Sequence, residues 1–201
     1  MHKLMKNYSY DYEWDVEYCY PDSNVLKNKL NITNAEDLVV AEREITSIKL
    51  AYAKQNIIEG NFDFLHLKKI HNFLFEDIYE WAGEYRHVDI SKGNQFCLWQ
   101  NLESYADTVF SSLKKENYLK NCDNVTERLA YYLSEINVLH PFREGNGRTQ
   151  RLFIEYLALN AGYRVDFSSV SPEEMIIASA ESFACEYDKI NEMFERITTK
   201  L

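Results

Sequence analysis

The sequence predicts a mainly α-helical protein that forms a single domain and carries one small β-hairpin. Apolar side chains recur at three- and four-residue spacing along most of the chain, which is the period of a helix with one buried face. Only 6 of the 201 residues are glycine, which favours helices over a turn-rich β protein. Hydrophobic residues make up 46% and aromatic residues 14% of the chain, enough to fill the core of one domain.

The predicted helices begin and end at recognisable signals. Thr33 and Glu36 have the spacing of a capping box, so the first helix is expected to begin there. Asp63 caps a second helix, which Gly83 ends. Ser171, followed by proline and then by glutamate at the third helical position, opens a later helix. The remaining helices are predicted at about 101–119, 124–139, 146–162 and 190–197.

In residues 84–99 the apolar side chains no longer follow the helical spacing. Val88, Ile90 and Phe96 flank the polar run 91–95, and a turn at Gly93 would fold the segment into a β-hairpin. At the start of the chain, residues 1–19 are rich in tyrosine and fit either a short strand or an extended arm. We therefore divide the chain into an N-terminal arm, 1–19, and a helical domain, 20–201.

Twelve consecutive residues, 140–151, stand between two apolar helical patterns and contain one histidine, one carboxylate, two glycines, one asparagine and three arginines. Charge placed where a core would otherwise continue is typical of a functional site. Gly145 and Gly147 allow the backbone to turn tightly and to approach a ligand closely. A helix beginning near Asn146 would point its first N–H groups and the positive end of its dipole at an anion.

The charged residues of this stretch suit a phosphate-bearing substrate. Arg148 and Arg151 are three residues apart, so they project from nearly the same face of a helix, and each can grip a polyphosphate with two hydrogen bonds. Glu144 beside them is a natural anchor for Mg²⁺, which prefers one or two carboxylates together with phosphate oxygens. His140 can accept a proton near neutral pH and is the candidate general base. These parts describe the transfer of a phosphate-bearing group to a hydroxyl.

The same stretch resembles the signature of Fic-domain proteins, His-x-Phe-x-Asp/Glu-Gly-Asn-Gly-Arg-x-x-Arg, and every fixed position is matched. The resemblance implies a Fic-type helical domain over 20–201 that moves AMP from ATP to a tyrosine, serine or threonine hydroxyl of a target protein. It implies that His140 deprotonates that hydroxyl, that Glu144 holds Mg²⁺ and that Phe142 anchors the loop. The implied phosphate-binding residues are Gly145, Asn146, Gly147, Arg148 and Arg151. An inactive version would be expected to have lost His140, Glu144 or Arg148, and none is lost.

In Fic proteins a hairpin called the flap precedes the signature and docks the target segment. The resemblance assigns this role to 84–99, because the main chain of an exposed strand can pair with an extended peptide. The alternative is a hairpin that only covers the core. The candidate docking residues are Val88, Asp89, Ile90, Ser91, Lys92 and Gly93.

The resemblance also raises the question of inhibition. Many Fic proteins carry a helix with the motif Ser/Thr-x-x-x-Glu-Gly/Asn, whose glutamate pairs with the position of Arg148 and competes with phosphate for its guanidinium. Here Glu59 is followed by glycine, but glutamine stands where serine or threonine is expected, and Glu186 is followed by tyrosine. Glu59 is therefore either inhibitory or part of a helix end. Otherwise a small antitoxin supplies the inhibitory helix, and Arg148 is the contested group.

Composition limits the other classes of function. The formal net charge of −10 argues against binding nucleic acid by counterion release. The sequence contains no apolar run long enough for a membrane span and no secretory signal at its start. Four scattered cysteines read as reduced thiols. His66 and His71 are five residues apart, off the spacing of a helical metal pair, and we expect one to be packed and one solvated.

These observations lead to one main hypothesis and several alternatives. The chain is expected to be a cytoplasmic adenylyltransferase, the toxin of a bacterial toxin–antitoxin pair, using ATP and Mg²⁺. The alternatives are a Fic-type enzyme with another phosphate-containing donor, an AMP-removing enzyme, and a non-catalytic nucleotide-binding module. The sequence predicts no oligomeric state.

Overall fold

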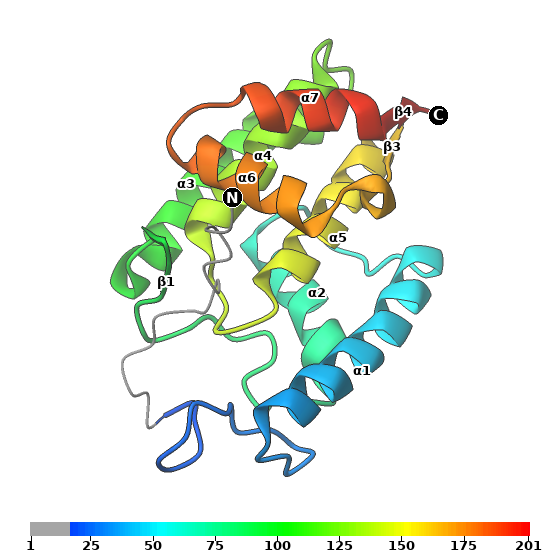
Figure 1. The fold of residues 1–201 in the computed structure, drawn as a ribbon. Helices are drawn as coiled ribbons and strands as arrows, with labels where there is room; N and C mark the ends of the chain where they lie inside the picture. The colour runs from blue at the N-terminus through cyan, green and yellow to red at the C-terminus, as the bar shows by residue number, and fades with distance from the viewer. Residues whose placement is uncertain (1–16) are drawn as a thin grey trace, which may run out of the picture.

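The computed structural model describes residues 17–201. Positions 1–16 of the predicted N-terminal arm, 1–19, therefore lie outside the described residues. Helices dominate this part of the chain and wrap around one hydrophobic core (Figure 1). The helices are α1 (Ala35–Gln55), α2 (Phe64–Phe75), α3 (Leu102–Lys115), α4 (Val125–Leu139), α5 (Asn146–Asn160), α6 (Pro172–Phe183) and α7 (Asp188–Ile197). The prediction of a mainly α fold is confirmed.

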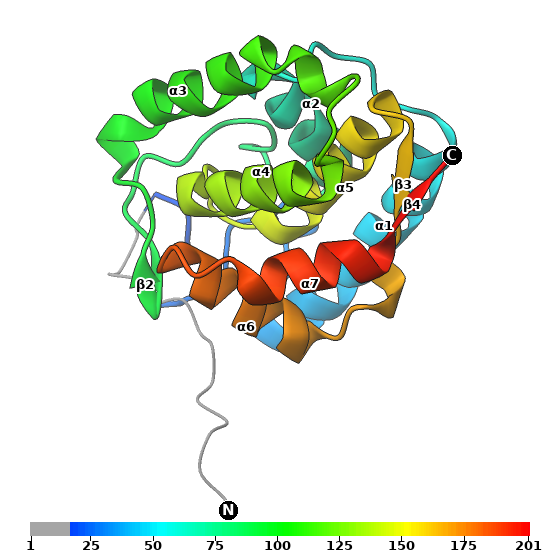
Figure 2. The same cartoon turned by 90° about the horizontal axis from the view of Figure 1, so that it is seen from above.

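Helices α4 and α5 form the centre of the fold. α4 packs against α3, α6 and α7, whereas α5 packs against α2, and α1 lies on the outer side of α2 (Figure 2). The inward side chains of the central pair are completely or almost completely buried, among them Leu129, Leu133, Phe153 and Leu157. Because α4 and α5 are both fixed by this packing, the short loop between them is held by rigid elements at each end.

The capping residues explain where several helices begin. The carboxylate of Asp63 accepts a hydrogen bond from the His66 N–H at 2.8 Å, and the hydroxyl of Ser171 accepts one from the Glu174 N–H at 3.1 Å, as predicted. At α1 the cap is Asn34 rather than Thr33. Its side-chain oxygen accepts hydrogen bonds from the first-turn N–H groups of Glu36 and residue 37, which places the helix start one residue later than the capping-box spacing suggests.

The second helix is shorter than predicted, because α2 ends at Phe75 and not near Gly83. The chain then turns back on itself, and Gly83 adopts a positive φ of 84° with its N–H donated to the ring of His71 on α2. Ile78 is fully buried although it lies in this turn. The apolar spacing thus predicted the buried side chains correctly. Beyond Phe75, however, a series of turns buries them, and not a helix.

Two further differences concern short elements. The helix predicted over 101–119 ends at Lys115, after which Asn117, Tyr118 and Leu119 have positive φ values and form a 3₁₀ turn. Two strands that the sequence analysis did not identify, β3 (Tyr163–Val165) and β4 (Thr198–Lys200), pair in antiparallel register. They join the end of α5 to the end of α7. Further 3₁₀ turns lie at Trp99–Asn101 and Phe167–Ser169.

The predicted hairpin is present before α3, but its paired part is small. Strands β1 (Ser91–Lys92) and β2 (Asn94–Gln95) are antiparallel, and Gly93 turns between them with φ 77°. The rest of 84–99 has no strand pairing of its own and packs against α4 and the following loop. Within residues 17–201, no helix is both long and apolar enough to cross a membrane. All four cysteines are free thiols.

Candidate active site

The loop between α4 and α5 is closed by its own side chains. Asn146 accepts a hydrogen bond from the Phe142 N–H at 2.8 Å and donates one to the Phe142 carbonyl at 2.7 Å. Both ends of the loop are left-handed, with φ 42° at His140 and 81° at Gly145. The side chain of Asn146 therefore shapes the loop, while the N–H groups at the start of α5 remain available to an anion, as at any helix N-terminus.

His71 attaches this loop to α2. Its imidazole stacks on the Phe142 ring with centroids 3.8 Å apart, and its Nε2 lies 3.0 Å from the Glu144 carbonyl oxygen. The Gly83 N–H is donated to Nδ1, so Nε2 must carry the proton and the ring is neutral. Burial lowers the pKa of His71 to about 3. Phe142 is buried at 1% exposure, so its predicted position as an anchor in the core is confirmed.

The expectation for the two α2 histidines was wrong in one respect. Both His66 and His71 are buried, whereas one was expected to be solvated. His66 contacts the carbonyl of Ile58 through Nε2 at 2.7 Å. The described residues contain no cluster of three or more histidine, cysteine, aspartate or glutamate side chains that could hold a metal ion.

The candidate base, His140, is 5% exposed. Its Nδ1 lies 3.2 Å from the Asn137 carbonyl; since a carbonyl only accepts, Nδ1 carries the proton and Nε2 keeps its lone pair. The ring stacks on Phe96 of the hairpin segment, with centroids 3.7 Å apart. Burial lowers the pKa of His140 to about 3, and the positive charges of Arg86 and Lys92 act in the same direction. The imidazole is therefore neutral and able to accept a proton.

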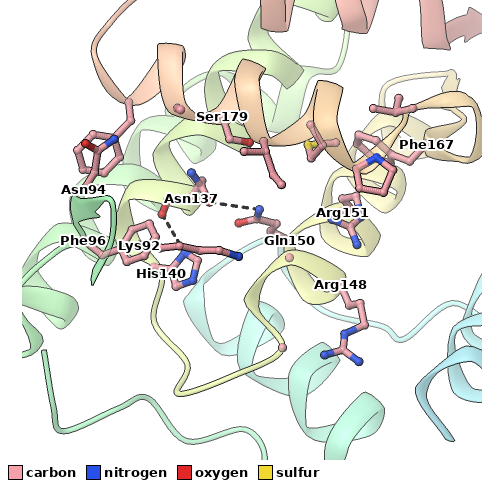
Figure 3. A pocket seen from close by; sticks show the side chains of 18 of the residues that line it. Lys92, Asn94, Phe96, Asn137, His140, Arg148, Gln150, Arg151, Phe167 and Ser179 are labelled. Carbon is pink, nitrogen blue, oxygen red and sulfur yellow. Dashed lines mark hydrogen bonds between the residues drawn. The ribbon is translucent and has the colours of Figure 1, made fainter. Parts of the chain in front are cut away.

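A cavity of about 460 Å³ opens above the loop. Figure 3 shows Lys92 and Phe96 of the hairpin segment on one side, Arg148 and Arg151 on the other, and His140 with Gln150 between them. Residues of α6 form an apolar wall. The predicted site residues that line the cavity are Lys92, His140, Glu144, Gly145, Gly147, Arg148 and Arg151.

Several predicted residues do not line this cavity. Asn146 is turned into the loop, and Ile90 is buried beneath the hairpin at 1% exposure. Gly93 and Asp89 are exposed. Val88, half-buried, and Ser91 also lie in the hairpin segment without reaching the cavity lining. The structure thus brings the base, the carboxylate and the arginines together, while most of the proposed docking residues lie beside the cavity.

Arg148 is held by α1, which the sequence analysis did not identify. Its Nη2 lies 2.5 Å from Glu42 Oε1, and its Nη1 donates to the Thr46 hydroxyl at 3.0 Å. The hydroxyl of Tyr79 donates to the other oxygen of Glu42. Glu42 and Thr46 are four residues apart and therefore lie on one face of α1. In the sequence, the contact with Arg148 is indicated only by a carboxylate on a helix face that is otherwise packed. Glu59 is exposed, as is Glu186.

The charges around Glu144 and Arg151 favour a bound ligand with both a cation and an anion. Burial raises the pKa of Glu144, and the nearby negative charge of Glu42 raises it further. Burial lowers the pKa of Arg151, and the positive charge of Arg148 adds to this effect. The Arg151 guanidinium lies over Gly147, where a Cβ atom would come within 3.2 Å of it. A phosphate chain with a divalent cation would compensate both sets of charges.

The helical fold with a neutral buried imidazole beside a helix N-terminus and two arginines defines a class of proteins that handle a polyphosphate. The comparisons with known proteins agree with this class: the family model described as Fic/DOC family matches residues 61–158, and close relatives match over most of the chain. The chain belongs to the Fic/DOC family.

Among the relatives, the protein adenylyltransferase VbhT of Bartonella schoenbuchensis is 41% identical over 91% of this chain, but the match covers 39% of that protein. The chain therefore spans well under half of the length of this relative. The probable protein adenylyltransferase Fic of Escherichia coli is 34% identical, and the match covers 91% of this chain and 92% of that protein.

Solved structures show the same fold. The BepC protein of Bartonella tribocorum with bound AMPPNP superposes with a TM-score of 0.88 at 25% identity, covering 94% of this chain and 100% of that chain. An N-terminal Fic domain from Bartonella quintana with bound ADP also has a TM-score of 0.88, at 29% identity, covering 94% of this chain and 97% of that chain.

Proposed function

We propose that this chain transfers AMP from ATP to a tyrosine, serine or threonine hydroxyl of a target protein. The observation that carries the proposal is that the imidazole of His140 and the N-terminus of α5 with its two arginines share one cavity. The adenylyltransferase names of the relatives and the adenine nucleotides bound in the similar structures support the same activity.

In the proposed reaction, His140 accepts the proton of the target hydroxyl while the hydroxyl oxygen attacks the α-phosphorus of ATP. A bond forms between that oxygen and the α-phosphorus, and the bond from the α-phosphorus to the bridging oxygen of pyrophosphate breaks. The N–H groups at the start of α5, with Arg148 and Arg151, stabilise the charge on the phosphates. The negative charge of bound ATP raises the pKa of His140 from its low value towards neutrality, where a general base is most effective.

Glu144 would hold Mg²⁺. Its carboxylate lines the cavity and is fixed by the Gly145 N–H at 2.9 Å, and one carboxylate together with phosphate oxygens is a ligand set that Mg²⁺ prefers. Bound Mg²⁺ supplies charge neutralisation to the phosphates during transfer. The raised pKa of Glu144 fits a carboxylate that gains from a neighbouring cation.

The hairpin is proposed as the target-docking flap. Its strand β1 has a partner on one side only, β2, so an extended target segment could pair with its other edge. Lys92 of β1 lines the cavity. The alternative, a hairpin that only covers the core, predicts that changes in Ser91 and Gly93 leave target labelling intact.

The biological role is proposed as that of a bacterial toxin acting in the cytosol and controlled by a small antitoxin that supplies an inhibitory helix. The support is indirect: the stretch before Glu59 lacks the serine or threonine of the inhibitory motif, and Glu59 is exposed in the loop that follows α1, which ends at Gln55. A partner glutamate would compete with the ATP phosphates for an arginine of the cavity.

Radiolabelled ATP tests the proposed chemistry. Incubation of the protein and Mg²⁺ with α-³²P-ATP and a bacterial cell extract should label protein, and γ-³²P-ATP should not, because the γ-phosphate leaves with pyrophosphate. His140→Ala should abolish labelling and keep binding of AMPPNP, which serves as the control for an intact site. Nucleotide binding without labelling by the unchanged protein would favour the non-catalytic module, and γ-labelling would indicate phosphate transfer.

A further inference from the structure

Arg86 is a completely buried arginine whose guanidinium is bound mainly by carbonyl groups. Its Nε donates to the carbonyl of His140 at 2.9 Å, its Nη1 donates to the carbonyl of Val88 at 2.7 Å, and its Nη2 donates to the carbonyl of Cys97. A carboxylate oxygen of Asp89 lies 3.8 Å from its Nη1. Burial lowers the pKa of Arg86 to about 10, and the group remains charged at neutral pH.

The three carbonyls belong to different parts of the site. The carbonyl of His140 ends α4 at the candidate base, whereas those of Val88 and Cys97 stand on the two sides of the β1–β2 hairpin. Main-chain hydrogen bonds also connect the hairpin segment to the end of α4 and to the loop that follows it. The Arg86 N–H is donated to the Pro141 carbonyl at 2.8 Å, and the Cys97 N–H to the Val138 carbonyl at 2.9 Å.

The side chains of the hairpin segment then reach the cavity from this fixed base. The ring of Phe96 stacks on the imidazole of His140, and Lys92 extends across the cavity mouth (Figure 3). A planar guanidinium can serve three carbonyls in set directions, whereas an ammonium group offers no such fork. Asp89 also stiffens the base of the hairpin, because its carboxylate accepts the Trp99 N–H at 2.8 Å.

We propose that Arg86 is a positioning residue that fixes the hairpin on the loop of His140, so that a hydroxyl docked on β1 arrives at a set distance from Nε2. The inference deepens the proposed function and rests on it for its catalytic consequence. Arg86 contacts neither nucleotide nor target. It acts through the carbonyl of His140 and through the two ends of the hairpin.

Arg86→Lys tests this directly because it keeps the positive charge and removes the fork, and Arg164→Lys is the control on an exposed arginine. Two quantities are measured. The first is hydrogen exchange of the Cys97 amide, compared with Leu133 in the middle of α4. The second is the rate of protein labelling from α-³²P-ATP in a bacterial extract, divided by the rate at which ATP alone is hydrolysed to AMP and pyrophosphate, where water replaces the target hydroxyl.

The expected result in Arg86→Lys is faster exchange at Cys97 without a matching change at Leu133, together with a fall of about 10- to 100-fold in the labelling ratio. Arg164→Lys should match the unchanged protein in both. Exchange at Cys97 and a labelling ratio equal to those of the unchanged protein would overturn the proposal.

Two further provisions keep the result decisive. If Arg86→Lys does not fold, Asp89→Ala loosens the same hairpin base from an exposed position. Because Asp89 is itself a candidate docking residue, hydrogen exchange at Cys97 is the deciding reading for this variant: faster exchange supports the proposal and unchanged exchange overturns it. If the unchanged protein neither labels protein nor releases AMP, the proposed function fails. The exchange at Cys97 then decides alone whether Arg86 holds the hairpin to the loop.

Discussion

At the scale of single residues, Gly145 is a position of the site where both the backbone conformation and the space require glycine. It is the N-cap residue of α5, with φ 81°, and a Cβ atom at this position would lie 2.3 Å from the Phe75 ring. Gly162 has a similar φ of 85° but open space around it. The two positions therefore separate backbone strain from a steric clash.

Gly145→Ala should destabilise the protein by about 1–3 kcal/mol more than Gly162→Ala, because both pay for a left-handed backbone but only Gly145→Ala overpacks the core. Urea unfolding of the two variants measures this difference in the free energy of unfolding. Equal losses would mean that Phe75 moves aside without cost.

The buried histidines predict how stability depends on pH. His71 has its pKa lowered to about 3 by burial, whereas the unfolded chain has the ordinary value near 6.5. Burial of the neutral ring therefore leaves the free energy of unfolding highest above pH ~6.5, and this free energy decreases as pH falls towards 3. The unfolded state takes up a proton in this range and the folded state does not.

His71→Gln, which can still donate to the Glu144 carbonyl, should reduce the loss of unfolding free energy between pH 6 and 4 by up to ~1.4 kcal/mol per pH unit. The variant is expected to be less stable at pH 7, since the stacking of the His71 ring on Phe75 and on Phe142 is lost. Urea unfolding across this pH range measures both effects. Identical slopes for the variant and the unchanged protein would show that His71 does not resist protonation in the fold.

At the scale of elements, α1 reaches the site through Glu42 and Thr46. Both terminal nitrogens of Arg148 are engaged by them, and the guanidinium lies 4.8 Å from the Phe75 ring centre. Arg148 was predicted to be the contested group, paired either with Glu59 of this chain or with a glutamate of a partner protein. The fold brings a different carboxylate to it, from a position 106 residues away in the chain.

Glu42→Gln should tighten AMPPNP binding by roughly ten-fold, because it removes a negative charge beside the phosphate site and weakens one charged hydrogen bond to Arg148. Calorimetric titration measures the dissociation constant. Glu44→Gln, on the exposed side of the same helix, and Glu59→Gly should leave it unchanged. Weaker binding in Glu42→Gln would mean that Glu42 orients Arg148 for the nucleotide, and a gain of labelling in Glu59→Gly would favour inhibition within this chain.

At the scale of the whole molecule, local signals predicted the helices well and long-range contacts poorly. Asp63 and Ser171 were identified as caps because capping depends on neighbours within one turn. The end of α2 was not predicted, because Gly83 folds back onto His71 through a tertiary contact. The strands β3 and β4 pair residues from 163–165 with 198–200, and three residues per strand are too few for a periodic signal.

The candidate site divides in the same way. The stretch 140–151 could be predicted because its residue types and spacing lie within twelve consecutive residues, a loop and the first turns of α5. Glu42 and Arg86 could not be predicted, since their roles depend on which backbone carbonyl or guanidinium the fold brings to them. The loop-closing hydrogen bonds of the Asn146 side chain could not be predicted for the same reason, and the assignment of Asn146 to the anion site stays a prediction.

The central claim is that His140 and the α5 N-terminus together transfer AMP to a protein hydroxyl. Mass spectrometry of proteins incubated with the chain, ATP and Mg²⁺ tests it most directly. The account predicts peptides that carry one AMP group on a tyrosine, serine or threonine, and no such peptides with His140→Ala. Peptides that gain only a phosphate group, or AMP-bearing peptides that persist with His140→Ala, would contradict it.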